Sequence, residues 1–199
     1  MLASDIYRTI AAPTESLYKE KGSKFIGLAF PVTAEEEIKV ILTSLRKTYF
    51  DARHHCYAYQ LGTTGDQYRA NDDGEPNHSA GDPILGQIRS AGLTNVLVVV
   101  VRYFGAIKLG VSGLITAYRL AAAEALKVAT VLEKSEMANL EILFDYVHLN
   151  TIMGIAKEFK LDIKEQDFNI SCRLKVAVRK SLAEKVQAKF SKLATVTLV

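Results

Sequence analysis

The feature that most constrains this chain is an uninterrupted apolar run at residues 96–101, VLVVVV, inside the longer stretch TNVLVVVVRYF. β-Branched residues favour strands, and a strand without polar alternation is typical of one that is buried on both faces. The run is far shorter than the roughly 20 residues that a membrane-spanning helix needs. We therefore expect it to be the central strand of a sheet in a globular protein.

A glycine-rich turn follows this strand and leads into a predicted helix. Gly105 and Gly110 allow a tight turn and a close approach of a ligand to the backbone. A helix with Ser112 as its N-cap would direct free N–H groups to the same place, and Lys108 and Arg102 add positive charge. The turn therefore predicts an anion-binding site. The spacing matches neither GxGxxG nor the P-loop, so an NTPase is unsupported, and glycines that serve packing alone are the alternative.

The first two thirds of the chain read as strands and helices in turn. We expect strands at 5–10, 23–32 and 54–62, a helix at 33–49 with Thr33 as N-cap, and a short helix at 84–92. Residues 63–83, rich in Gly, Asp, Asn and Pro, are predicted to be an irregular loop with a function. The helix after residue 110 is expected to bury Val111, Leu114, Ile115, Tyr118, Ala122, Ala125 and Leu126, with close packing at the alanine run 121–123.

After about residue 130 the predicted elements follow the order β-α-β-β-α-β, which is the ferredoxin-like order. The strands are expected at 138–146, 161–168, 170–178 and 192–199, and the helices at 147–160 and 179–191. The sequence therefore predicts an α+β protein of two domains, residues 1–132 and 137–199.

Two further clusters carry polar side chains that often act in catalysis or binding. Arg53, His54 and His55 stand at the start of the strand at 54–62, where alternation sends the two histidines to opposite faces. They cannot bind one metal together, so we expect no metal and no cofactor. The acidic residues of the loop, Asp72, Asp73 and Glu75, lie beside His78 but match no calcium loop or catalytic triad. Capping of the following helix is the favoured interpretation of this loop.

Charge and cysteine content restrict the class of protein. The formal net charge is +3 over 199 residues, which permits a local basic patch but is below that of a dedicated nucleic-acid binder. Cys56 and Cys172 form neither a disulfide framework nor a zinc pattern, which is typical of a reducing compartment. The N-terminus lacks the pattern of a signal peptide. We expect a cytoplasmic protein without membrane association.

The blocks KEKGSKFIG, ARHHCYAY, DDGEP, AGDPIL and VVVVRYFGAIKLG occur in this order. In this combination the chain resembles the IMPACT family, in the two-domain form of its bacterial YigZ group. The family pattern lies at about residues 19–126, and the tail looks like the domain that bacterial members add. The resemblance implies a first domain of the ribosomal protein S5 domain 2 type, with a mixed sheet backed by helices. It also implies a tail similar to a domain of elongation factor G.

The resemblance also implies a role in translation. Eukaryotic members regulate translation by binding a partner of a stress-responsive kinase, and bacterial members are associated with nucleic-acid binding. Several positions depart from the family pattern: His78 replaces a glycine and Asp82 replaces a basic residue. The glycine pair of the turn is Gly105-Ala106, and residues 109–114 read LGVSGL where the family has LGTGGL. The loss of that basic residue moves the expected phosphate contact to the turn at 105–112.

Together these observations predict a binding protein linked to translation, which contacts RNA or a ribosome-associated protein. The expected contact residues are Arg53, His54, Arg102, Tyr103, Gly105, Lys108, Gly110 and Ser112, with Asp73 and Glu75 orienting the cations. Of Tyr103 and Phe104, one is expected to stack on a base and at least one to pack. The alternatives are an enzyme for a phosphorylated small molecule, with His54 or His78 transferring protons, and a pure protein–protein adaptor. The cognate partner and the oligomeric state do not follow from the sequence.

Overall fold

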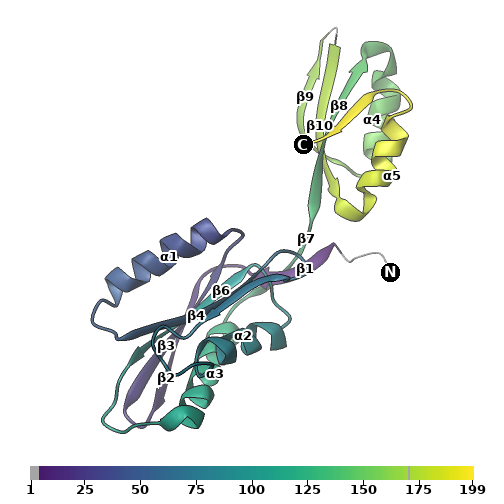
Figure 1. The fold of residues 1–199 in the computed structure, drawn as a ribbon. Helices are drawn as coiled ribbons and strands as arrows, with labels where there is room; N and C mark the ends of the chain where they lie inside the picture. The colour runs from purple at the N-terminus through teal and green to yellow at the C-terminus, as the bar shows by residue number, and fades with distance from the viewer. Residues whose placement is uncertain (1–4, 170) are drawn as a thin grey trace. The chain divides into compact units, whose positions relative to one another are not determined.

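The computed structural model describes residues 5–169 and 171–199, and its fold is α+β, as predicted. The start of the first predicted domain, residues 1–4, and the first residue of the strand predicted at 170–178 lie outside the described residues. The chain divides into two compact units. One comprises residues 7–134, and the other comprises residues 135–199 with the N-terminal residues up to Ile6 (Figure 1).

The larger unit is built on a five-stranded sheet in the order β2-β3-β6-β4-β5. The strands are β2 (Thr14–Glu20), β3 (Ser23–Pro31), β4 (His54–Leu61), β5 (Gln67–Asn71) and β6 (Val96–Tyr103). β6 lies in the middle, between β3 and β4, as the apolar run predicts. Each neighbouring pair is antiparallel, so the expectation of a mixed sheet is wrong.

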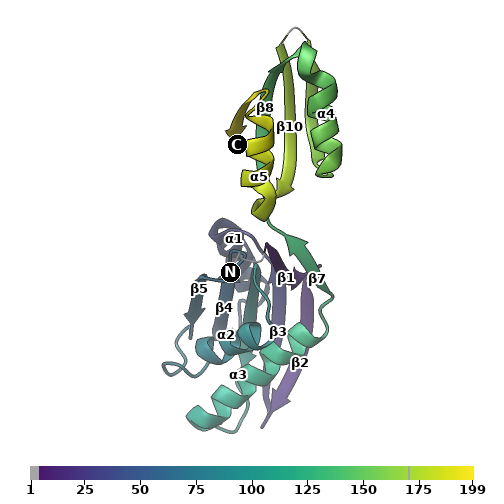
Figure 2. The same cartoon turned by 90° about the vertical axis from the view of Figure 1, so that its right-hand side faces the viewer.

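Helices cover both faces of this sheet. The helix α1 (Glu35–Thr48) lies on one face, and α2 (Gly81–Ser90) and α3 (Gly110–Lys127) lie on the other (Figures 1 and 2). Alternate residues of β6 belong to the two layers. Val98 and Val100 join the core beneath α2 and α3, whereas Leu97 and Val99 join the core beneath α1. Because both faces of β6 are covered, no position on it up to Val101 favours a polar residue.

The alanine run of α3 packs closely against the sheet, as predicted. Ala121 and Ala122 are fully buried. A Cβ placed on Gly27 of β3 would lie 2.4 Å from the carbonyl oxygen of Ala121, so the helix backbone almost touches the strand. The buried stripe of α3 differs from the predicted one and includes Ala117 and Ala121. Val111 and Ile115, which were expected to be buried, are 52% and 38% exposed.

Neither predicted N-cap is present. α1 begins after Ala34, and the Thr33 hydroxyl donates to the Glu37 carboxylate over 2.6 Å instead of to the helix backbone. Ser112 lies inside the first turn of α3, whose N-cap is Leu109. Neither N-cap residue makes a side-chain cap hydrogen bond. A capping residue is recognised in the sequence by its type alone. The residue at which a helix begins depends on the backbone conformation of the preceding segment.

Three strands were not predicted. β2 forms a hairpin with β3, and β5 lies inside the stretch at 63–83 that was expected to be irregular. β5 pairs with β4, and this long-range pairing outweighs the turn-forming composition of the segment. β7 (Val131–Ser135) pairs with β1 (Ile6–Ile10) in a two-stranded sheet. It begins inside the first predicted domain, which was expected to end at residue 132, and ends before the second, which was expected to start at residue 137.

In the smaller unit the elements run β-α-β-β-α-β, the order that the sequence predicts. They are β8 (Met137–Asp145), α4 (Leu149–Glu158), β9 (Asp162–Phe168), β10 (Ser171–Arg179), α5 (Lys180–Phe190) and β11 (Thr195–Leu198), with a short turn of 3₁₀ helix at Tyr146–His148. The sheet order is β11-β8-β10-β9, and its pairs are antiparallel. In the part of the chain that the structure describes, no helix has the length and apolar character to span a bilayer.

Candidate functional site

The site is centred on Arg102, the first polar residue after the valine run. Strand alternation turns its side chain to the face that α2 and α3 cover, between Phe25 of β3 and His54 of β4, its direct partners in the sheet. Only 4% of the Arg102 side chain is exposed. A buried guanidinium requires a counter-charge, and Glu75 supplies it: Nη1 of Arg102 donates to Oε1 of Glu75 over 2.5 Å.

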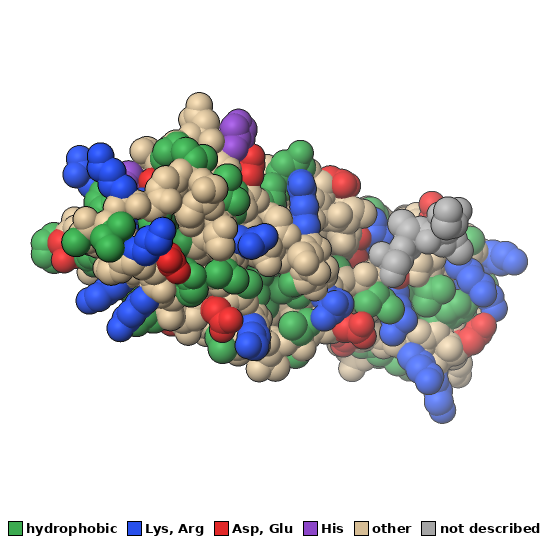
Figure 3. Space-filling model, turned by 90° about the horizontal axis from the view of Figure 1, so that it is seen from below, with side chains coloured by type: hydrophobic (Ala, Val, Ile, Leu, Met, Phe, Trp, Pro, Cys, Tyr) green, Lys and Arg blue, Asp and Glu red, His purple; other side chains and the backbone are tan. Residues whose placement is uncertain are grey.

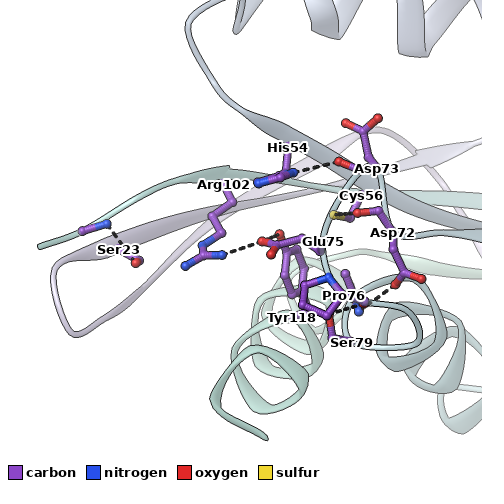
Figure 4. Close-up of polar contacts among 12 residues, drawn as sticks. Ser23, His54, Cys56, Asp72, Asp73, Glu75, Pro76, Ser79, Arg102 and Tyr118 are labelled. Atoms are coloured by element: carbon purple, nitrogen blue, oxygen red, sulfur yellow. Dashed lines mark hydrogen bonds and ion pairs between the residues drawn. The ribbon is translucent and has the colours of Figure 1, made fainter. Parts of the chain in front are cut away.

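Glu75 reaches Arg102 from the loop between β5 and α2 (Figure 4). The same oxygen, Oε1, also accepts a hydrogen bond of 2.7 Å from the hydroxyl of Tyr118 on α3. Burial raises the pKa of Tyr118, so its hydroxyl stays protonated and acts as a donor. The neighbouring thiol of Cys56 donates to the carbonyl of Asp72, and burial raises its pKa as well. Cys56 is therefore an unreactive core thiol.

Asp72 holds the loop in place as the cap of α2. Its carboxylate accepts hydrogen bonds from three backbone N–H groups: those of His78, Ala80 and Gly81, at 2.8 to 2.9 Å. These donors include the first amides of the helix, which otherwise lack partners. The expectation that an acid of this loop caps the following helix is thus confirmed for Asp72.

Asp73 does not pair with the cations of the predicted site. Its carboxylate accepts one hydrogen bond from Arg46 and another from the backbone N–H of His55, each of 2.7 Å. Burial by itself would raise the pKa of Asp73, but the hydrogen bonds from Arg46 and the His55 amide outweigh it and lower the pKa. The backbone carbonyl of Asp73 also lies 2.7 Å from Nδ1 of His54. Because a carbonyl only accepts, Nδ1 of His54 carries the proton.

A cavity of about 300 Å³ opens between this loop and the turn that joins β6 to α3. We call it the turn cavity. Arg102 and Glu75 line its floor, and Lys108, Gly105 and Gly110 line its edge. The remaining walls are apolar: Pro76, Phe104, Ile107, Leu109, Val111 and Leu114.

Phe104 is the exposed aromatic residue of this turn. Its ring lies 4.2 Å from the guanidinium carbon of Arg102 and 5.8 Å from that of Arg53, yet 51% of the residue remains exposed. His54 packs edge-on against the same ring, with centroids 5.4 Å apart. Arg53 and His54 therefore adjoin the turn cavity through Phe104.

The two glycines of the predicted site have different structural roles. A Cβ on Gly105 would lie 2.3 Å from the carbonyl carbon of Gly22, so Gly105 is required where the β6–α3 turn packs on the β2–β3 turn. Gly110 adopts φ +70° at the start of α3, a conformation that favours glycine, and a Cβ there would meet no atom within 4 Å. Packing therefore accounts for Gly105, and backbone conformation accounts for Gly110.

Besides Arg53, His54 and Asp73, two further predicted residues do not line the turn cavity. Tyr103 faces the α1 side of the sheet, and its hydroxyl donates to Asp51 over 2.7 Å, which raises the pKa of Tyr103 to about 12. Ser112 lines a second cavity of about 280 Å³ with Lys21. Of the ten predicted contact and supporting residues, the structure thus brings Glu75, Arg102, Gly105, Lys108 and Gly110 together at the turn cavity.

Two lysines near the turn had no role in the sequence-based interpretation. Lys21 lines the second cavity, and Lys24 lines a third of about 290 Å³ with Tyr103 and Phe104. Both belong to the β2–β3 hairpin, whose turn packs on Gly105. The signal was available in KEKGSK, where lysines flank a glycine turn, but its position beside the β6–α3 turn depends on the tertiary structure.

His78, a proton-transfer candidate in the enzyme alternative, is well exposed and pairs with Asp82, 2.6 Å away. Its backbone has φ +64°, a conformation that favours the glycine expected at this position in the family pattern. Neither residue lines the turn cavity. Among the described residues, no group of three or more His, Cys, Asp or Glu side chains is placed to hold a metal ion.

Comparison with known proteins finds relatives over most of the chain. The model of the Impact N-terminal domain matches residues 21–126. The IMPACT family member YigZ of Escherichia coli (strain K12) is 32% identical over 183 residues, covering 91% of this chain and 90% of that protein. YvyE of Bacillus subtilis (strain 168), another IMPACT family member, is 35% identical over 159 residues, covering 80% and 73%. A crystal structure of an hypothetical protein matches with a TM-score of 0.71 at 31% identity, covering 98% of this chain and 96% of its own.

Proposed function

The chain belongs to the IMPACT family, as its sequence blocks predict, and on this basis we propose that it is a cytoplasmic binding protein linked to translation. In this proposal the larger unit contacts RNA or a ribosome-associated protein through the turn between β6 and α3. The family's eukaryotic members, which regulate translation, support the link to that process. The turn cavity beside Lys108 supports the proposed place of contact.

The observation that carries the proposal is the group of side chains around the turn. Lys108 and the start of α3 offer positive charge at the edge of the turn cavity, and Phe104 offers an exposed ring beside Arg53. Single-stranded nucleic acids bind to this combination, because cations contact the phosphates and aromatic rings stack on the bases. On the face shown in Figure 3, basic side chains are interspersed with acidic and apolar ones. This mixture favours a local contact over a broad basic surface.

The two units have architectures that agree with this proposal. We assign residues 7–134 to the ribosomal protein S5 domain 2 type and residues 135–199 to the ferredoxin-like type. For the larger unit, the support is a sheet with helices on both faces. For the smaller unit, it is the sheet order β11-β8-β10-β9 with the element order β-α-β-β-α-β. The resemblance of the smaller unit to a domain of elongation factor G connects it to the ribosome.

RNA binding over a salt series from about 50 to 300 mM tests the proposal, because each phosphate contact adds to the salt dependence. We expect steep dependence for the parent and weaker binding with a shallower slope, by about one, for Lys108→Glu. Lys127→Glu is the matched control, since Lys127 is exposed near the other end of the same helix. Equal salt slopes for Lys108→Glu and Lys127→Glu would show that the turn does not contact the RNA. If only a protein partner is captured and RNA does not bind at low salt, the adaptor alternative replaces RNA binding.

A further inference from the structure

We propose that the turn cavity binds one nucleotide unit, with the base inside the cavity and the phosphate at its edge. The nucleotide is either free in solution or an unstacked residue of single-stranded RNA, and the two sources share the same chemistry. This inference rests on the proposed function, because it places the ligand at the same turn. It adds what the cavity recognises.

The floor of the cavity is electrically neutral but has unused hydrogen-bonding capacity. Arg102 and Glu75, each 4% exposed, cancel in charge. The two hydrogen bonds to the Glu75 carboxylate both fall on Oε1, which leaves Oε2 as an acceptor. A neutral ligand group that donates a hydrogen bond matches this floor, and the edge of a nucleobase carries such a donor.

The walls of the cavity suit the body of a base. They are formed by apolar side chains, with the half-exposed ring of Phe104 at one side. Aromatic and apolar walls stabilise bases that have left a stack. The volume of about 300 Å³ lies at the lower end of small-ligand sites, so it admits one nucleotide and not a folded element of a partner.

The edge of the cavity suits a phosphate. α3 begins at Gly110 without a side-chain cap and without an acid in its first turn. No carboxylate of the helix therefore competes with a phosphate for its N-terminal N–H groups. The exposed Lys108 lies beside them. Helix N-termini and lysines both favour phosphate oxygens.

An apolar side chain from a protein partner fits the walls but not the floor. It would cover Oε2 of Glu75 with hydrocarbon, and buried polar groups without partners are costly. Glu75 would repel a ligand group with only negative charge, and Arg102 would repel one with only positive charge. The combination of a neutral polar floor, apolar walls and a basic edge therefore selects a nucleotide.

The test fills the cavity without changing any charge. Val111→Trp replaces a wall residue of the turn cavity by a large ring, at a position that is 52% exposed and so tolerates the change. Val128→Trp, at a 58% exposed position at the other end of α3, is the matched control. Calorimetry with AMP, GMP, CMP and UMP probes the free nucleotides. Fluorescence anisotropy with a labelled single-stranded RNA of about 12 residues, and with the same RNA lacking its bases, probes the polymer.

We expect Val111→Trp to weaken binding by about tenfold or more, which is the scale of one stacked base, without a change in salt slope. Val128→Trp should bind as the parent does. If the mononucleotides bind the parent and this binding is lost in Val111→Trp, free nucleotide is the source. If only RNA binds, the source is the polymer, and the advantage of base-containing over abasic RNA must disappear in Val111→Trp.

Two outcomes would overturn the inference, and they separate it from the proposed function. In the first, Lys108→Glu lowers the salt slope of RNA binding, but Val111→Trp binds RNA as tightly as the parent protein does, and the parent binds abasic RNA as tightly as RNA with bases. The phosphate contact then stands and the base site does not exist. If neither RNA nor mononucleotides bind, this inference falls together with the RNA contact of the proposed function, and only the protein contact is left.

Discussion

Arg102 and Glu75 form an ion pair 2.5 Å long that is almost completely enclosed, and Tyr118 donates to the same carboxylate oxygen. The pair connects the end of the central strand to the loop before α2. Removing one member leaves an unpaired buried charge, which is far more costly than removing both.

We therefore expect Arg102→Met to lower the free energy of unfolding by about 3–5 kcal/mol, and Glu75→Leu to have a similar effect. The double variant Arg102→Met/Glu75→Leu should be much less destabilised than the sum of the two, because no unpaired charge remains. Urea denaturation of the four proteins measures this coupling. Additive losses would show that the two charges do not stabilise each other.

Asp72 should be the most important side chain for the start of α2. Asp72→Ala removes the acceptor of three backbone N–H groups, and we expect a loss of about 2 kcal/mol, the upper end for a helix cap. Asp82→Ala changes an exposed acid in the first turn of the same helix and serves as the control. Urea denaturation should show little change for Asp82→Ala. Equal losses would mean that helix electrostatics, and not the cap, sets the stability.

Alanine substitution should distinguish the three glycines that differ in environment. Gly105→Ala forces a Cβ within 2.7 Å of three backbone atoms, and we expect a loss of about 3 kcal/mol. Gly110→Ala meets no atom but must adopt φ +70°, so the loss should be about 1 kcal/mol. Gly86→Ala, inside α2 in open space, should stabilise by up to about 1 kcal/mol. Thermal unfolding would contradict this order if Gly110→Ala were the most damaging of the three.

His55 should make the protein less stable in mild acid. Burial lowers the pKa of His55 below its ordinary value of 6.5. As the pH falls below about 6.5, the unfolded chain takes up a proton that the folded chain does not, so folding stability decreases until the lower folded pKa is reached. His55→Phe should remove this contribution, because phenylalanine does not titrate. Unfolding free energies between about pH 4.5 and 8 measure the slope.

His78 provides the contrasting control for this measurement. Its hydrogen bond to Asp82 raises the pKa of His78, so its contribution to stability is present in acid and is lost as the pH rises through the raised value. His78→Asn keeps a residue that tolerates the positive φ. It should change the pH dependence in the opposite direction to His55→Phe. Identical profiles for His55→Phe and the parent would exclude His55 as the titrating group.

Patterns within single elements allowed correct predictions. The valine run identified the central strand, because only a strand covered on both faces tolerates such a run. Alternation correctly placed His54 and Cys56 on one face of β4 and His55 and Tyr57 on the other. The element order of the smaller unit also followed from periodicity. In each case the signal lies in consecutive residues.

What the tertiary structure decided depends on residues that are distant in the chain. β5 exists because β4 offers it a partner, and Glu75 neutralises Arg102 across 27 positions. The same holds for the contact of Gly105 with Gly22, and for the separation of Tyr103 and Ser112 from the turn cavity. The sequence by itself determined the central strand, the element order of the smaller unit, the family and the position of the glycine-rich turn after the central strand. Which side chains meet at that turn was decided only by packing, because distances between separate elements follow from the whole fold and not from local spacing.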